Sequence, residues 1–416
     1  MRIFLLIFLC FSSNIGVSQM TVLRKWDIGQ PLLIRVKQDT LIPMYFYFGD
    51  EFVGNTLNSE KWYDNYPWGG LEVENHIAAS PHFVSQKNGL LVLKTDRADY
   101  IKSIPNWMLT EEFKKKNQDV LLEGNTFQVN YSTSAIYSKT PFQYGYFEAR
   151  CKVPAQKGVW PAFWLYGQNN KDEIDFMEMK GERTDNYHID IHHPDKKIER
   201  YKGFLVFKKR FGAWLKADED IVEKWVTYSG LWEPNKVTFF MDGMPTGVFY
   251  GDFETQQNII LNSSIAVDGK AFSPGPDNST IFPNYFEVDY VRLWTEGYYG
   301  KDAGFPNRNV DDEMELATIT KKSLPKKMNA KRKLNNEQGF ISIMPTKLEH
   351  VFQLRLSGVF SPVTIQLMNQ ENQSAFTQTF INKSQLLNLS HLDEGKYTLI
   401  IQIDQNSFER SINLKK

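Results

Sequence analysis

The sequence predicts an all-β protein that consists of a large jelly roll followed by a second, small C-terminal β-sandwich domain. Short runs rich in aromatic and β-branched residues recur along the chain, and Gly, Asn, Asp and Pro separate them. All ten tryptophans lie between Trp26 and Trp294, so the C-terminal part differs in composition from the rest. A chain of 416 residues is also too long for one ordinary core.

The N-terminus, MRIFLLIFLCFSSNIGVSQ, has the features of a secretory signal peptide over residues 1–19. One early Arg precedes an apolar run from Ile3 to Phe11, and small residues precede Gln19, where we expect cleavage. The run is too short for a membrane anchor, so no membrane span is expected. The mature chain keeps only Cys151, which allows no intrachain disulfide and leaves stability to the core.

Residues 20–300 carry most of the predicted strands, including GLLVLKT, YGYFEARCKV, KVTFFMDG and YFEVDYVRLW. Helical periodicity is clear only in NWMLTEEFKKKNQDV, residues 106–120. Many short strands over this length indicate two stacked antiparallel sheets. This segment is therefore the predicted jelly roll.

Residues 301–339 contain an acidic cluster followed by a basic one without an apolar period, which indicates a solvated linker. Residues 340–416 contain the short alternating runs VFQLRLSGVF, PVTIQLMNQ and KYTLIIQI, which predict the small β-sandwich. Over the whole chain the net charge is -1, so nucleic acid is not an expected partner. We expect a monomer.

The segment KDEIDFMEMKGE, Lys171 to Glu182, places carboxylates within a predicted strand. Strand alternation puts Glu173 and Asp175 on one face and Glu178 on the other. A β-bulge would shift the parity by one residue and return Glu178 to the face of the other two. The two Glu carboxyl groups could then approach the separation of about 5 to 5.5 Å that retaining glycoside hydrolysis requires. A solvated strand face is the alternative.

The chain resembles glycoside hydrolase family 16 over roughly Phe48 to Trp294. The segments FGDEFVGNTLNSEKW, YSTSAIYSKTPFQYGYFEARCKVP, GVWPAFWLYG, DEIDFMEMKG, VTFFMDG and IFPNYFEVDYVRLW occur in the family's order. The resemblance implies a concanavalin-like jelly roll that cleaves internal β-linkages of polysaccharides with retention of configuration and without a cofactor. In the bulged branch of the family the strand reads Glu-x-Asp-x-x-Glu. That match implies Glu173 as nucleophile, Glu178 as acid/base and Asp175 as the residue that shares a proton with Glu173.

Sugar binding requires flat apolar side chains, since pyranose rings pack their C–H faces on aromatic rings. The substrate-binding candidates are Trp160, Trp164, Trp68, Tyr66, His192 and His188. His192 resembles the family's histidine near the cleaved bond, and His188, Asp190 and His192 share one strand face. A metal at this set would lack further ligands. The resemblance also implies that a structural Ca²⁺ is frequent, and Glu51 and Asp289 match that region loosely.

The closing segment IAVDGKAFSPGPDNSTIFPNYFEVDYVRLW resembles family members that cut β-1,3-glucan, so a laminarin-type substrate is expected. Asp268 replaces an expected Gly, and the segment from Ala98 to Tyr131 is unusually long. An endo-β-galactanase that acts on agar, porphyran or carrageenan is therefore the alternative. The basic residues that could meet sulfate are Lys180, Arg183, Lys196, Lys197 and Arg200. A lectin that binds sugar without cleaving it is an alternative of another class.

The C-terminal segment LSHLDEGKYTLIIQIDQNSFERSINLKK resembles the sorting domains of the Bacteroidetes type IX secretion pathway. This resemblance implies secretion machinery as a partner and a secreted or cell-surface protein. A small carbohydrate-binding module is the alternative for this domain. It is disfavoured because its sugar site would have to work without Trp.

Overall fold

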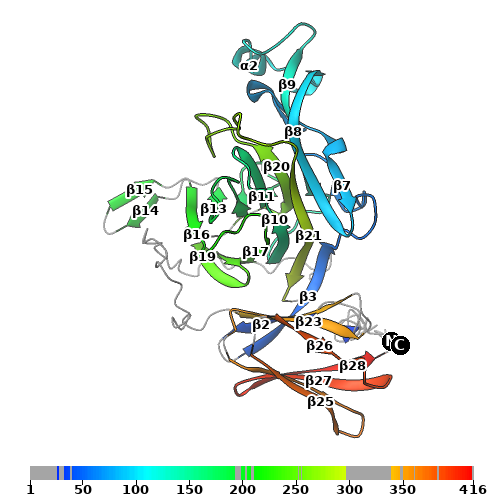
Figure 1. Cartoon of the computed structure of the whole chain (residues 1–416). Coiled ribbons are helices and arrows are strands. Elements are labelled where there is room, and N and C mark those ends of the chain that lie inside the picture. Colours follow the sequence, from blue (N-terminus) through cyan, green and yellow to red (C-terminus); the bar gives the residue numbers. More distant parts are fainter. Residues whose placement is uncertain are drawn as a thin grey trace, which may run out of the picture. The chain divides into compact units, whose positions relative to one another are not determined.

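The computed structural model describes residues 26–27, 32–37, 40–192, 198–201, 204–207, 210–251, 253, 255–296, 339–346, 350–359, 361–381 and 384–414. The chain divides into a small unit, residues 1–43 with 340–416, and a large unit, residues 44–339. Both are built almost entirely from β-strands, as predicted (Figure 1). The predicted signal peptide and nearly all of the linker lie outside the described residues. Among those described, no helix has the length and apolar character needed to span a membrane.

The large unit contains two sheets. The first runs in the order β19 (Met244–Tyr250), β18 (Lys236–Met241), β17 (Trp225–Glu233), β10 (Gly145–Lys152), β21 (Asn284–Thr295), β8 (Leu90–Ser103) and β7 (Val84–Lys87). The later part of β21 pairs instead with β3 (Thr40–Asp50).

The second sheet, here named the site sheet, runs β16 (Arg210–Lys216), β13 (Asn186–His192), β12 (Glu173–Glu178), β11 (Val159–Gly167), β20 (Gln257–Ile265), β9 (Thr126–Ser138) and β4 (Trp62–Tyr63). One hydrophobic core joins the two sheets, with Phe147 from the first stacked on Phe176 from the second at 5.7 Å. This arrangement of antiparallel sheets is the predicted jelly roll. A further hairpin, β14 (Ile198–Tyr201) with β15 (Phe204–Phe207), pairs only with itself among the described strands.

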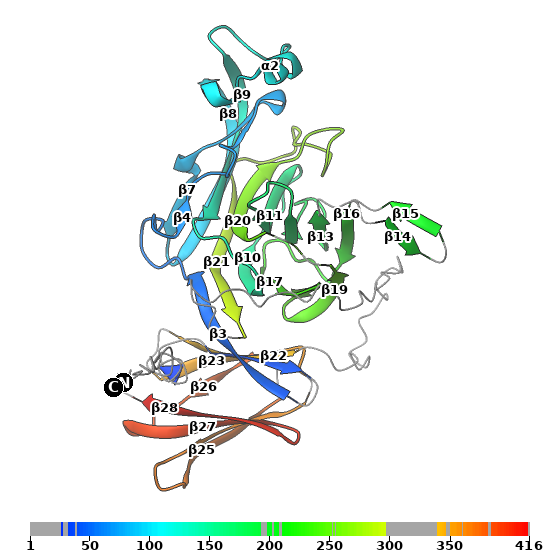
Figure 2. The same cartoon turned by 180° about the vertical axis from the view of Figure 1, so that it is seen from behind.

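The β8–β9 hairpin extends past the two sheets, as both views show (Figure 2). At its end lie a 3-10 turn, η3 (Asn106–Met108), and a helix, α2 (Glu111–Lys116). The helix starts where the Thr110 hydroxyl accepts the Phe113 amide at 3.1 Å. It ends at Asn117, whose side chain donates to the Phe113 carbonyl. The predicted helix over residues 106–120 is therefore much shorter, because these local side-chain bonds end it.

The end of this hairpin packs on the segment that follows residue 70. That segment comprises β5 (Leu71–Glu72), η1 (Val73–Asn75) and β6 (Ile77–Ala79), and η2 (Pro81–Phe83) comes next. A separate apolar cluster joins the two parts, with Leu71 and Val73 on one side and Ile104 and Phe127 on the other. The long insert therefore has a core of its own and a defined position on the large unit.

The small unit is a β-sandwich with its own core. One sheet runs β1 (Trp26–Asp27), β28 (Asn406–Leu414), β27 (Gly395–Ile403), β24 (Val363–Met368) and β25 (Ser374–Phe380). The other joins β2 (Leu32–Lys37), β22 (Gly339–Pro345), β23 (Val351–Ser357) and β26 (Ser384–Asn388). The second small β-sandwich predicted from residues 340–416 is present.

The sequence predicts that the jelly roll begins at residue 20. In the structure the N-terminal strands β1 and β2 belong instead to the small unit. Leu32 and Ile34 are buried in its core, next to side chains from the C-terminal strands. An apolar alternation shows that a strand has a buried face, but it does not show which sheet covers that face. Trp26 pairs with Ile412 of β28, so the small unit does contain a tryptophan. The argument against a sugar-binding module from missing Trp therefore fails.

Candidate active site

Strand β12 contains the predicted bulge. Between Asp175 and Glu178 it has two residues, whereas β13 has only Ile189 between the partners of those positions. On the other side, β11 pairs with Asp175 and Met177 and leaves Phe176 unmatched. Phe176 and Met177 both enter the core, so Glu178 turns to the opposite face. The one-residue shift therefore places Glu173, Asp175 and Glu178 on the same side of the site sheet.

The extra residue of the bulge, Phe176, packs its ring against a glycine in the opposite sheet. A Cβ on Gly230 of β17 would lie 2.1 Å from Cε1 of Phe176, so only a glycine there leaves room for the ring. The ring also packs on Phe147 and Phe163, with centroids 5.7 and 5.1 Å away. Core packing thus holds the residue that sets the parity of the strand.

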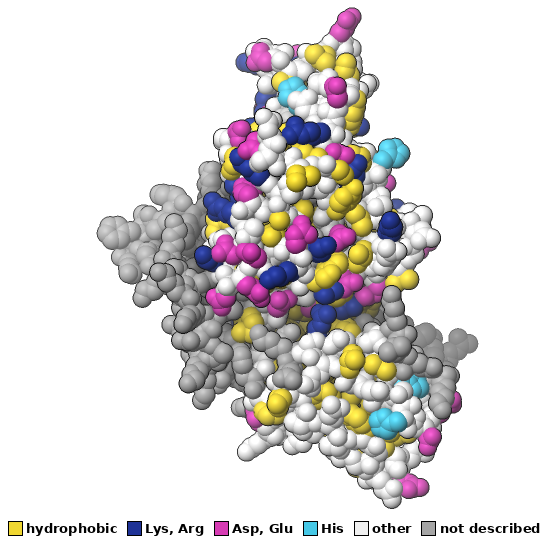
Figure 3. All heavy atoms as spheres, in the orientation of Figure 1, with side chains coloured by type: hydrophobic (Ala, Val, Ile, Leu, Met, Phe, Trp, Pro, Cys, Tyr) yellow, Lys and Arg dark blue, Asp and Glu magenta, His cyan; other side chains and the backbone are white. Residues whose placement is uncertain are grey.

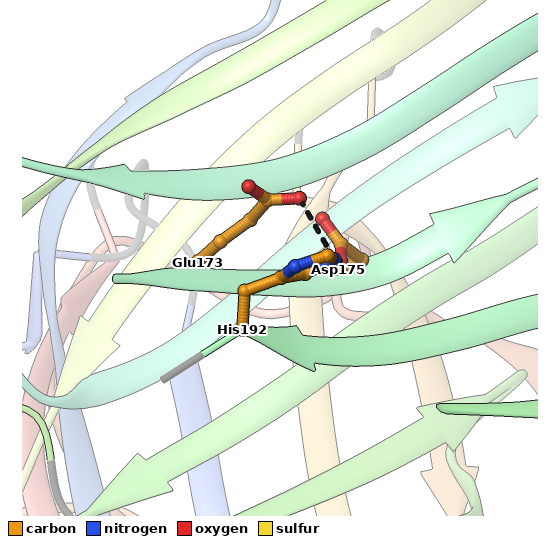
Figure 4. Close-up of side chains that lie close together, drawn as sticks. All are labelled: Glu173, Asp175 and His192. Atoms are coloured by element: carbon orange, nitrogen blue, oxygen red, sulfur yellow. Dashed lines mark ion pairs between the residues drawn. The ribbon is translucent and has the colours of Figure 1, made fainter. Parts of the chain in front are cut away.

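Strand β13 brings an imidazole to the first two carboxylates (Figure 4). His192 lies opposite Glu173 in the register, and its Nε2 is 3.4 Å from Glu173 Oε1 and 3.8 Å from Asp175 Oδ2. The same nitrogen is 3.5 Å from Asp190 Oδ2. The Nε2 atom of His192 therefore lies within ion-pair distance of three carboxylates. Among them, the side chain of Asp175 is only 3% exposed.

Asp190 is a site residue that the sequence placed on the correct face without a functional role. It lies opposite Asp175, and its buried carboxylate accepts the backbone N–H of Ile191 at 2.8 Å. Gly212 of the neighbouring strand β16 lies beneath it, since a Cβ there would be 2.9 Å from Asp190 Cγ. The alternation in HIDIHH is the sequence signal that could have identified Asp190 as a site residue.

Glu178 has a histidine partner of its own. His188 lies opposite Glu178, and its Nδ1 is 3.0 Å from Glu178 Oε2. Both side chains are largely buried. The register therefore places His188 beside Glu178, and its role in substrate binding stays a prediction.

An aromatic cluster, here named the Trp160 cluster, surrounds His188 and consists of Trp160, Trp214 and Phe272. His188 is 5.0 Å from Trp214 and 5.6 Å from Phe272 between ring centroids. Phe272 stacks on Trp160 at 4.4 Å and an interplanar angle of 13°. One face of Trp160 is therefore covered by Phe272, which leaves a sugar only its other face. Neither Phe272 nor Trp214 was a sequence candidate, because Phe272 lies in a segment without periodicity.

The basic residues considered as possible sulfate contacts occupy different positions. Lys180 is only 5% exposed, donates to the carbonyl of Ser273 and pairs with Glu182 at 2.9 Å. It therefore holds the segment that carries Phe272, and it is neither a sulfate contact nor the plain surface charge that was the alternative. The Arg183 guanidinium lies over the Trp214 ring, 4.6 Å from its centroid. Lys196, Lys197 and the side chain of Arg200 lie outside the described residues.

A second group of rings, here named the aromatic row, consists of Tyr66, Trp68, Trp164 and Tyr166. Trp68 is 4.9, 6.0 and 5.5 Å from the other three in that order. Tyr166 lies opposite Glu173, and burial together with the negative charge of Glu173 raises its pKa. Tyr66 is buried beneath Trp68, where burial raises its pKa, so it supports the row rather than offering a face. In the run Trp164-Leu165-Tyr166, strand alternation puts Tyr166 on the same face as Trp164. Tyr166 could therefore have been predicted as a site candidate from the sequence.

The expected structural calcium site is not supported. Arg292 forms a two-pronged ion pair with Glu51 at 2.7 and 2.8 Å, and Arg150 pairs with Asp289 at 2.6 Å. These guanidinium groups already neutralise the two carboxylates. In the described part of the chain, the groups of His, Asp and Glu atoms that lie close enough to share a cation are the site residues themselves: Glu173, Asp175 and His192, and Glu178, His188 and Asp190.

The candidate site lies in a segment that matches a known family. Residues 75–271 match the model of Glycosyl hydrolases family 16. The chain carries a family 16 glycosyl hydrolase domain. The matched range contains the bulged strand, His188 and His192, whereas Trp68 and Phe272 lie outside it.

Individual relatives of the family 16 domain were also found. A glucan endo-1,3-beta-glucosidase from Cryptopygus antarcticus is 24% identical over 278 residues, covering 59% of this chain and 90% of that protein. Glucan endo-1,3-beta-glucosidase A1 from Niallia circulans is 24% identical over 292 residues, covering 61% of this chain but only 38% of that protein. The laminarinase catalytic domain from Thermotoga maritima superimposes with a TM-score of 0.47 at 22% identity, covering 61% of this chain and 98% of that one.

Proposed function

We propose that this glycoside hydrolase is a retaining endo-β-glycanase that hydrolyses internal β-glycosidic bonds of a polysaccharide, with β-1,3-glucan as its first candidate substrate. The observation that carries the proposal is the bulge in β12, which puts Glu173, Asp175 and Glu178 on one face of the site sheet. A pair of carboxylates on one face is the equipment that glycoside hydrolysis requires.

In the proposed mechanism the Glu173 carboxylate attacks the anomeric carbon while Glu178 gives its proton to the leaving glycosidic oxygen. The C–O bond to the leaving sugar breaks as the bond to Glu173 forms. Glu178, now ionised, then takes a proton from water, and the resulting hydroxide displaces Glu173 from the same carbon. Two inversions at one carbon give net retention of configuration.

The neighbouring groups suit these roles. His188 contacts Glu178 at 3.0 Å and can orient its carboxyl group. His192, 3.4 Å from Glu173, can orient the nucleophile. Asp175 is nearly inaccessible, lies between the two glutamates on the strand and is 3.8 Å from His192 Nε2, so it can help to hold the imidazole beside Glu173.

Aromatic rings flank both glutamates, which supports action inside a long chain. The aromatic row lies beside Glu173 through Tyr166, and the Trp160 cluster lies beside Glu178 through His188. An endo-acting enzyme has to bind sugar units on both sides of the cleaved bond. The two sets of rings provide apolar surface for this purpose.

Two relatives bear the name glucan endo-1,3-beta-glucosidase, which supports β-1,3-glucan as the substrate. The second candidate is a sulfated galactan, and one observation favours it. Arg183 holds a positive charge against Trp214, within the aromatic cluster next to Glu178. A guanidinium in that position could bind a sulfate group of the sugar.

A digest panel tests the proposal. Laminarin, mixed-linkage glucan, agarose, porphyran and carrageenan are incubated with the enzyme, and the products are separated by chromatography. We expect laminarin to give a ladder of oligosaccharides early in the reaction, because internal bonds are cut. Cleavage of a galactan instead would move the assignment to the second candidate. Folded protein that cleaves none of the five would favour a lectin.

We also propose that the chain is secreted or displayed at the cell surface and that the small unit serves export or attachment. The apolar N-terminus and the resemblance of the C-terminal segment to sorting domains support this. The small unit has its own core, so hydrolysis should not depend on it.

Removal of the small unit should therefore leave hydrolysis intact. A fragment of residues 44–338 should match the full chain in kcat/KM on soluble oligosaccharides. Truncation at residue 338 alone is the wrong design, because Leu32 and Ile34 would lose their core partners. A tenfold loss of kcat/KM in the fragment, with its thermal unfolding still cooperative, would contradict independent units.

A further inference from the structure

The end of the β8–β9 hairpin presents one large aromatic side chain to solvent. Trp107 is 65% exposed, although the turn that carries it is well fixed. The amide of Met108 donates to the Pro105 carbonyl at 3.0 Å, and the Met108 side chain packs on the apolar cluster beneath. Figure 3 shows hydrophobic surface at this end of the hairpin, near the top of the view. An exposed ring on an ordered turn binds a ligand with little loss of conformational entropy.

Trp107 lies directly beside the loop that carries Tyr66 and Trp68 of the aromatic row. A Cβ on Gly69 would be 3.2 Å from Cζ2 of Trp107, so the indole edge contacts the backbone next to Trp68. Gly69 and Gly70 have φ of +89 and +66, a conformation that favours glycine, so a tight turn directly follows Trp68. Trp68 is itself 36% exposed. Because Trp68 packs against Tyr166, the residue opposite Glu173, Trp107 adds a further ring next to the row on that side.

Charged contacts tie the hairpin to the rest of the large unit. Glu74 of η1 pairs with Lys116 of α2 and with Lys270, each at 2.7 Å. Hydrogen bonds from these two lysines hold the pKa of Glu74 below its usual value, so the carboxylate is ionised at neutral pH. Lys270 lies two residues before Phe272. The end of the hairpin, the η1 segment and the segment beside Glu178 are therefore linked.

We propose that Trp107 forms a distal sugar-binding subsite, which stacks on a pyranose unit of the same glycan chain, remote from the cleaved bond on the Glu173 side. This inference rests on the proposed function, because it takes a polymeric β-glycan as the ligand. The C–H face of a pyranose ring matches the indole in shape and polarity, and stacking needs no charged partner. The long insert then has a purpose: it lengthens the binding surface for a polymer.

The test is a comparison of substrates of increasing length. Wild type and Trp107→Ala are assayed on laminari-oligosaccharides from the trimer to the hexamer and on laminarin. We expect KM on laminarin to rise about 5- to 20-fold with kcat unchanged, the loss that removal of one stacked ring produces. On the shortest oligosaccharide that is cleaved, the two proteins should agree, because that substrate ends before Trp107.

Two further variants distinguish a sugar-binding role of Trp107 from a role in folding. Ile101→Ala, on the same hairpin and 62% exposed, should leave both kinetic constants unchanged on every substrate. Trp107→Tyr should recover most of the affinity for laminarin, since it keeps an aromatic face. An equal loss on short and long substrates, or a change in molecular mass by light scattering, would assign Trp107 to folding or self-association and overturn the proposal.

The outcome for the wild type distinguishes the two proposals. If the wild type cleaves agarose rather than laminarin, agaro-oligosaccharides replace the laminarin series. Unchanged kinetics of Trp107→Ala on the polymer that the wild type cleaves would overturn the distal subsite and leave the proposed function intact. A wild type that cleaves no member of the panel would overturn both.

Discussion

Glu178→Ala should nearly stop hydrolysis of the polysaccharide while activated aryl glycosides still react. In the proposed mechanism the variant lacks the proton donor that a poor leaving group needs, but it keeps Glu173 as the nucleophile that forms the glycosyl-enzyme. We expect kcat on the polymer to fall about 10²- to 10⁴-fold. Added azide should enter the space left by the carboxyl group and attack the intermediate. The product should be a β-glycosyl azide, which proton NMR distinguishes from its α-anomer.

Glu173→Ala should fail on both kinds of substrate, because no covalent intermediate forms without the nucleophile. Azide would then attack the free α-face and give an α-glycosyl azide. Glu287→Ala is a suitable control, since Glu287 pairs with Lys152 on the first sheet. If the azide product of Glu178→Ala proved to be α, the roles of Glu173 and Glu178 would have to be exchanged.

Gly230→Ala should damage the candidate active site from the opposite sheet. The new methyl group would lie 2.1 Å from the Phe176 ring, so the side chain at the bulge has to move. We expect a loss of about 2 to 4 kcal/mol in the free energy of unfolding, which lowers the unfolding midpoint by about 5 to 10 °C. We also expect kcat to fall in the protein that remains folded, because the bulge aligns Glu178 with Glu173.

A double-mutant cycle checks the cause. Phe176→Ala alone should cost about 3 to 5 kcal/mol, since it leaves a cavity in the core. Together with Gly230→Ala it should cost less than the sum, because the alanine methyl group fills part of that cavity. Additive losses would show that Gly230 and Phe176 do not interact, and the explanation of the bulge would be wrong.

Much of the active site was readable from one strand. The alternation in KDEIDFMEMKGE puts Glu173 and Asp175 on one face, and the position of Glu178 requires a bulge if all three are to act together. The alternation in NYHIDIHH likewise puts His188, Asp190 and His192 on one face. Strand periodicity is local, so these side-chain directions could be predicted without knowledge of the fold.

Other features depended on contacts between distant segments. The bulge residue is Phe176 because Gly230, on another sheet, leaves room for its ring. Lys180 reads as a surface charge in the sequence, but the carbonyl of Ser273 and Glu182 hold it inside the unit. Phe272 covers one face of Trp160, although nothing in its own segment indicates an aromatic partner.

The sequence by itself therefore predicted a β architecture, a shared face for Glu173 and Asp175, and the need for a bulge if Glu178 is to join them. The tertiary structure decided which surfaces meet: β2 joins the small unit, Tyr66 lies under Trp68, and Trp107 lies against Gly69. The physical reason is that periodicity records whether a face is buried. The identity of the partner depends on shape and on unoccupied volume, which only the folded chain provides.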